Sequence, residues 1–118
     1  MISHVVLFRP KSDLSHDERE RLARAFEYAV QRIPTVRAVR IGKRTAVGAA
    51  YEQQQPANSP DVLIAIDFDD VAGLRTYLEH PEHVELGDRF TRASSTTLVF
   101  DFDVMQSTSG ILGFLQPE

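Results

Sequence analysis

VLIAIDFDDVAGLRTYLEHPEH, residues 62–83, is the stretch that decides the fold. Its first seven residues have the length of a strand, and four apolar side chains share one face: Val62, Ile64, Ile66 and Phe68. Asp69 or Asp70 then caps a helix, which Pro81 interrupts. The helix directs three apolar side chains inward: Val71, Leu74 and Leu78. The stretch therefore predicts a strand followed by an amphipathic helix.

The same order of strand and helix stands at the start of the chain. Residues 2–9 alternate as a strand that is apolar on both sides, with Ile2, His4, Val6 and Phe8 on one face and Val5 and Leu7 on the other. Ser15 and Glu18 form a capping box, and a helix follows that ends before Pro34. Its apolar stripe recurs at helical spacing: Leu22, Ala25, Phe26, Ala29, Val30 and Ile33.

The remaining segments complete a strand–helix–strand–strand–helix–strand order. Residues 36–47 predict a charged edge strand ended by Gly48, and residues 49–60 a long loop. A short helical piece is expected over 81–90 and the last strand over 96–104. Such an order gives an α+β fold of the ferredoxin-like βαββαβ type, a four-stranded antiparallel sheet with its helices on one face. The other face would be bare and apolar, so two sheets are expected to close into a dimeric α+β barrel.

A chain of 118 residues is the size of one domain, which we place at residues 1–104. Residues 105–118 form a tail in which the polar spacer QSTSG precedes ILGFL. Five residues of that kind are expected to dock on the domain or on a partner subunit.

Composition excludes several classes of site. The chain has no cysteine, so disulfides, thiolate zinc sites and cysteine nucleophiles are ruled out, and a cytoplasmic location is expected. No apolar run approaches the roughly 20 residues of a membrane span. The net charge is −4, but residues 1–44 are basic and the remainder acidic, which predicts attraction between halves of the fold or between subunits. Arginines alternate with glutamates along the first helix, so no nucleic acid is expected to bind.

The most titratable stretch is residues 77–83, which holds a tyrosine, two histidines and two glutamates. His80 and His83 would ligate a metal only if one helix ran through both, and Pro81 prevents this, so no metal site is expected. In the plainer interpretation, His80 caps the turn and His83 is half-buried. Asp101 and Asp103 alternate with phenylalanines and are expected to point outward from the last strand.

His4 differs from the other histidines because it lies in the middle of a strand, on a face expected to be buried. A buried imidazole needs hydrogen-bond partners, and its pKa near neutrality suits proton transfer. A core histidine satisfied by such partners is the plainer alternative. The chain has no glycine-rich phosphate loop and no serine-hydrolase signature.

Five segments together resemble the stress-responsive A/B barrel (Dabb) family: MISHVVLF (1–8), VRAVRIG (36–42), VLIAIDFDD (62–70), YLEHPEHVELGD (77–88) and LVFDFD (98–103). The resemblance covers about residues 1–104. It implies a dimeric α+β barrel with a pocket between sheet and helices. In the family's polyketide cyclases, the positions that match His4, Tyr77 and His83 form the active site. Those cyclases also have a histidine where this chain has Asp61 and Val62.

Three functions fit this resemblance. The first is a cofactor-free, polyketide cyclase-like enzyme of carbonyl chemistry, in which His83 is the base, Tyr77 donates to the oxyanion and His4 orients. Its small hydrophobic ligand would contact four further side chains: Val6, Phe8, Ile64 and His80. The second is a non-catalytic, stress-responsive protein that binds a small ligand in the same pocket. The third, a cofactor-free monooxygenase, rests on fold analogy.

Overall fold

The computed structural model describes residues 1–117. Its four strands are β1 (Ile2–Pro10), β2 (Ala38–Lys43), β3 (Val62–Phe68) and β4 (Ser94–Asp103). Its α-helices are α1 (His16–Arg32), α2 (Val71–Glu79), α3 (Pro81–Ala93) and α4 (Ile111–Leu115). Two short 3₁₀ helices are η1 (Ala50–Gln54) and η2 (Thr108–Gly110).

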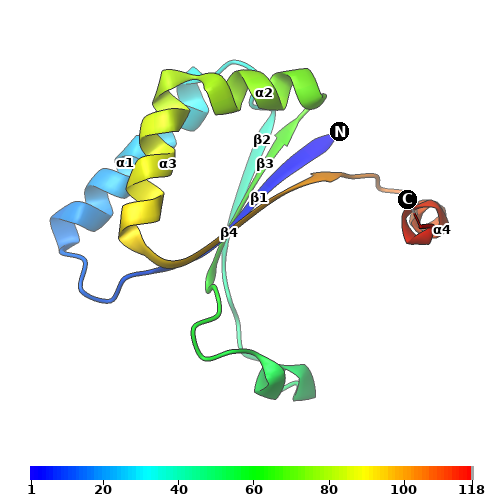
Figure 1. The fold of residues 1–118 in the computed structure, drawn as a ribbon, viewed down its shortest axis with the longest axis horizontal. Coiled ribbons are helices and arrows are strands. Elements are labelled where there is room, and N and C mark those ends of the chain that lie inside the picture. The colour runs from blue at the N-terminus through cyan, green and yellow to red at the C-terminus, as the bar shows by residue number, and fades with distance from the viewer. Residues whose placement is uncertain (118) are drawn as a thin grey trace.

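The strands form one antiparallel sheet in the order β2-β3-β1-β4, which confirms the ferredoxin-like topology. Helices α1, α2 and α3 lie together on one side of this sheet (Figure 1). The central strand β1 pairs with both β3 and β4, so that His4 lies opposite Ile66 on one side and Asp101 on the other. Residues of the first and last strands therefore lie side by side at one edge of the sheet.

The apolar core lies between the sheet and the helices. Ser15 and Glu18 form the capping box, each side chain bonding the other's backbone N–H at 3.1 Å, so α1 begins where the sequence predicts. Ile33 closes that helix and is fully buried with Phe68 of β3. Asp70 caps α2 by accepting from the Gly73 N–H at 2.8 Å.

Several predicted boundaries were wrong, and pairing explains most of the differences. Strand β2 is shorter than residues 36–47 because β3 begins at Val62, which faces Lys43. The segment 49–60 is not a continuous loop but contains η1. Helix α3 runs three residues further than expected, and β4 begins two residues earlier, where Ser94 pairs with Pro10. In α2, Val71 is exposed and Tyr77 is buried in its place.

The side of the sheet away from the helices is apolar and uncovered, and we call it the open face. It consists of alternate residues of the strands, among them Val5, Leu7, Leu63, Leu98, Phe100 and Phe102. Phe100 and Phe102 are each 50% exposed, and their rings lie 6.2 Å apart. A patch of this kind is typical of an association surface.

Some basic residues of the first half form ion pairs with acidic residues of the second half. Arg37, from the basic half, bonds Asp69 at 2.9 Å, and Lys43 bonds Asp61 at 3.0 Å. Both acids belong to the acidic half. The two ion pairs therefore connect the ends of β2 with the ends of β3, as attraction between the halves predicts.

The C-terminal segment leaves the sheet after Val104, whose N–H bonds the Met1 carbonyl at 2.9 Å. Helix α4 stands apart from the layer of α1, α2 and α3 (Figure 1). Its apolar side chains stay exposed in the single chain. No helix within residues 1–117 combines the length and apolar character needed to cross a membrane.

Candidate functional site

Three side chains from three different elements come together over the sheet. His4 projects from the middle of β1, Tyr77 from the last turn of α2 and His83 from the first turn of α3. The ring centroids of Tyr77 and His83 lie 4.5 Å apart, and that of His4 lies 5.8 Å from Tyr77 and 6.2 Å from His83. The structure thus gathers the three residues that sequence reasoning selected as catalytic.

These three side chains line one cavity of about 200 Å³ between the sheet and the helices. The rest of the lining is mostly apolar: Val6, Phe26, Ile64, Ile66, Leu78, Leu86, Gly87, Phe90, Thr91, Thr97 and Val99. The exposed members Thr91, Thr97 and Val99 place the mouth between α3 and the edge strand β4. The cavity therefore offers a few polar groups in an apolar enclosure, as small-molecule sites do.

His83 is held as a neutral base. Its Nδ1 lies 3.1 Å from the Leu78 carbonyl oxygen, which can only accept, so Nδ1 carries the proton and Nε2 keeps its lone pair. Burial lowers the pKa of His83, the nearby His4 lowers it further, and the bond to Leu78 opposes both. Because the pKa lies below its ordinary 6.5, the ring is neutral at pH 7 and able to accept a proton.

Tyr77 is held as a neutral phenol. Its side chain is only 2% exposed and packs against Phe68, with ring centroids 5.2 Å apart. Burial raises the pKa of Tyr77 to about 12. The hydroxyl therefore stays protonated at physiological pH and acts as a donor rather than as a base.

His4 is fixed by a residue that sequence reasoning missed. Its Nδ1 lies 2.6 Å from a carboxylate oxygen of Asp101 on β4. The Asp101 side chain is 42% exposed, as the pattern predicts, but its register opposite His4 places it on the helix side of the sheet, where it bonds the imidazole. The alternation of Asp101 with Phe100 and Phe102 was the available signal, since the phenylalanines occupy the open face.

The four residues expected to contact the ligand divide into two pairs. Val6 and Ile64 line the cavity. Phe8 does not, because it is buried against Phe90 at a centroid distance of 4.9 Å. His80 does not either, because it is the N-cap of α3 and its Nδ1 accepts from the Glu82 N–H at 3.1 Å. For Phe8 and His80 the predicted ligand contact is therefore corrected.

Asp61 and Val62 stand where the polyketide cyclases have a further histidine, and neither residue contributes to the cavity. Asp61 is engaged at the end of β3 by Lys43 and, at 3.9 Å, by Arg9. Val62 faces Phe8 in the ladder, and neither residue lines the cavity. The site of this chain accordingly consists of His4, Tyr77 and His83 without that group.

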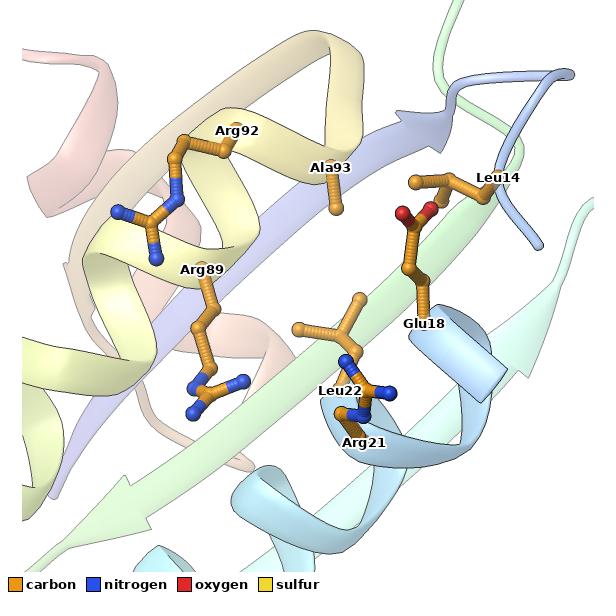
Figure 2. Close-up of a pocket in the computed structure, with 7 residues that line it drawn as sticks. All are labelled: Leu14, Glu18, Arg21, Leu22, Arg89, Arg92 and Ala93. Atoms are coloured by element: carbon orange, nitrogen blue, oxygen red, sulfur yellow. The ribbon is translucent and has the colours of Figure 1, made fainter. Parts of the chain in front are cut away.

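A second cavity, of about 300 Å³, lies on the surface between α1 and α3 (Figure 2). Its charged lining consists of Glu18, Arg21, Arg89 and Arg92, and Arg89 bonds Glu85 at 2.9 Å. It contains neither histidine nor tyrosine, so it offers no base that is neutral near pH 7. Within residues 1–117, no group of three or more metal-ligating side chains is placed to hold an ion.

Comparison with known proteins places the chain among relatives of the same fold. Olivetolic acid cyclase of Cannabis sativa is 22% identical over 101 residues, which are 86% of this chain and 94% of that protein. Hydroxynitrile lyase from Passiflora edulis superposes with a TM-score of 0.74 at 17% identity, covering 90% of this chain and 94% of that one. A dimeric ferredoxin-like protein of unknown function from Thermobifida fusca superposes with a TM-score of 0.65 at 23% identity, covering 87% and 90%.

The family model of the stress responsive A/B barrel domain matches residues 2–104, which include the whole sheet, all three packed helices and the site. Apart from Met1, the segments that suggested this resemblance all lie within the match. The chain therefore belongs to the stress responsive A/B barrel domain (Dabb) family.

Proposed function

We propose that this chain is a cofactor-free enzyme that removes a proton next to a carbonyl group of a small hydrophobic substrate and uses the carbanion for aldol-type ring closure. The observation that carries the proposal is the convergence of a neutral histidine base, a neutral phenol donor and an oriented second histidine on one apolar cavity. The relative named as a cyclase and the fold neighbour named as a lyase support chemistry of this class.

Each step uses a group described above. Nε2 of His83 takes the proton from the carbon beside the carbonyl, and the C–H electron pair becomes the enolate. The Tyr77 hydroxyl donates a hydrogen bond to the enolate oxygen and so stabilises the developing charge. The enolate carbon then attacks a second carbonyl of the same molecule, forming the C–C bond, and protonated His83 returns the proton to the new alkoxide. Proton and charge balance without any further reactant.

The cavity sets the size and polarity of the substrate. Its volume of about 200 Å³ is smaller than the roughly 300–1,000 Å³ of typical ligand pockets, so only a small reacting portion is enclosed. Apolar side chains such as Phe26 and Leu86 exclude water from that portion. A longer substrate would extend through the mouth beside Val99.

The test is proton exchange at carbon. Small ketones and polyketide-like β-dicarbonyl compounds are first screened by thermal shift, and the loss of C–H signal in D₂O is then followed by NMR. We expect His83→Gln to abolish enzyme-dependent exchange and Tyr77→Phe to slow it, with ligand-induced thermal shifts retained. His16→Gln and Tyr51→Phe are matched controls, because both residues are exposed and lie outside the cavity. Ligand binding with exchange equal in wild type and His83→Gln would instead identify a binding protein.

We also propose that two copies join through their open faces. The half-exposed Phe100 and Phe102 support this, as does the dimeric state of the Thermobifida fusca neighbour. Sedimentation velocity should give a dimer at micromolar concentration, and Phe100→Glu should give a folded monomer by circular dichroism. A wild-type monomer under those conditions would refute the dimer without touching the catalytic proposal.

A further inference from the structure

The C-terminal segment has an ordered local structure but no surface to pack on within its own chain. Residues 105–117, which we call the arm, leave the sheet after Val104. Within the arm, the Gly110 N–H bonds the Ser107 carbonyl at 3.2 Å, and the Met105 side chain lies over Gly110. The arm is therefore a shaped element and not an extended tail.

Helix α4 of the arm presents only apolar side chains to solvent. Ile111, Leu112, Phe114 and Leu115 are 56–72% exposed. A helix of five residues is also far below the roughly 12–15 residues at which an isolated helix becomes even marginally stable in water. Both observations require a second surface that covers α4.

Within the described residues, the arm's own domain does not supply that surface. Helix α4 stands apart from α1, α2 and α3 (Figure 1). The family match ends at residue 104, so the arm lies outside the part of the chain that matches the family. The covering surface must therefore come from another molecule.

We infer that the arm of one subunit packs against the partner subunit in the dimer proposed above, on which this inference rests. The arm continues directly from β4, whose side chains Leu98, Phe100 and Phe102 belong to the open face. Joining two open faces brings the partner to the strand from which the arm emerges. Residues 105–117 contain no Lys, Arg, Asp or Glu, so burying the arm in a protein interface requires no charge to lose its water.

A membrane surface is the rival occupant, and the composition of the arm argues against it. Peripheral helices that bind lipid usually combine an apolar face with Lys and Arg for the anionic headgroups. The arm has neither basic residue, and α4 has a single turn. The second copy of the chain is therefore the occupant that the arm fits.

The first experiment places a fluorescent reporter in the arm. The chain has no cysteine, so Leu115→Cys introduces a unique site for an environment-sensitive dye. We expect blue-shifted emission in the wild-type dimer and solvent-like emission in the monomeric Phe100→Glu background. Equal, blue-shifted emission in both would mean that the arm docks on its own domain, which overturns the inference.

The second experiment measures the dimer itself by sedimentation equilibrium. Leu112→Ser with Phe114→Ser should raise the dimer dissociation constant by roughly tenfold or more, whereas the matched control Val84→Ser, on the exposed side of α3, should leave it unchanged. An unchanged dissociation constant in the arm variant overturns the inference. If the arm then also makes the protein co-sediment with phosphatidylserine-containing vesicles, the arm binds a membrane surface instead. A wild-type monomer would refute the dimer itself, so the two failures are distinguishable.

Discussion

The Nδ1 atom of His4 lies 2.6 Å from a carboxylate oxygen of Asp101, although 97 positions separate the two residues along the chain. A carboxylate can only accept, so Nδ1 donates and the other ring nitrogen, Nε2, is the one left for a ligand. The pair joins the first strand to the last on the helix side of the sheet. We therefore propose that Asp101 is a positioning residue for His4 in the candidate site.

The first prediction concerns this pair. Asp101→Asn removes the charge that holds the His4 ring, and hydrogen bonds to charged groups contribute about 1.5–3 kcal/mol. If that contribution is made in the transition state, kcat should fall about 10–100-fold with a smaller change in KM. Asp103→Asn is the control, because Asp103 is exposed on the same face of β4 and faces Ile2. Equal effects of the two substitutions would contradict the assignment.

The second prediction concerns pH and stability. The folded state lowers the pKa of His83 below 6.5, so between the folded and unfolded pKa values the unfolded chain binds more protons. The contribution of His83 to stability is therefore fully present above pH 6.5 and is lost as pH falls through the folded pKa. Thermal unfolding followed from pH 7.5 downward should decline less steeply for His83→Gln than for wild type. The same residue should give the acidic limb of the exchange rate, and identical slopes for both proteins would refute the assignment.

The third prediction concerns the mouth of the cavity. Val99→Phe adds bulk at a residue that lines the cavity and is 50% exposed, so it should exclude longer substrates while leaving stability nearly unchanged. KM should rise with substrate chain length in the variant. Val84→Phe is the matched control, since Val84 is 54% exposed on α3 and lies outside the cavity. A uniform loss for all chain lengths would indicate that the mouth lies elsewhere.

The fourth prediction concerns the start of α1. Ser15→Ala removes the side-chain acceptor of the Glu18 N–H and should lower the free energy of unfolding by about 1 kcal/mol. Ser12→Ala is the control, because Ser12 provides only its backbone carbonyl to Arg19. Urea denaturation gives both values. No difference between the two variants would mean that the capping box does not stabilise the helix.

Sequence patterns predicted the fold because the apolar residues of each packed helix or strand recur at the spacing of that element. The alternation over Val62–Phe68 and the helical stripe behind Ser15 are local signals, and sheet order follows from chain connectivity. Boundaries failed where they depend on another segment. Strand β2 ends at Lys43 only because β3 begins opposite it, which no pattern within residues 36–47 indicates.

The candidate site was likewise predicted where the signal is local and missed where it depends on another segment. Two histidines flank Pro81, and its preference for the first position of a helix makes His80 the cap and His83 the inward residue. Phe8 and Val6 share a face, but Phe8 packs against Phe90 of α3 while Val6 lines the cavity, and the full length of α3 was not visible in the sequence. Asp101 was missed because its side of the sheet depends on the long-range register between β1 and β4.

The central place of β1 in the sheet also determines when the protein can fold during synthesis. Its hydrogen-bonding partners are residues 62–68 and 94–103, so β1 is made before both of the strands with which it pairs. Until β4 has been made, a strand that is apolar on both faces has an unpaired edge, which exposes a nascent or truncated chain to aggregation. The sheet therefore cannot form until β4 has been made, and a chain that stops before Ser94 holds His4 without the Asp101 carboxylate that bonds it.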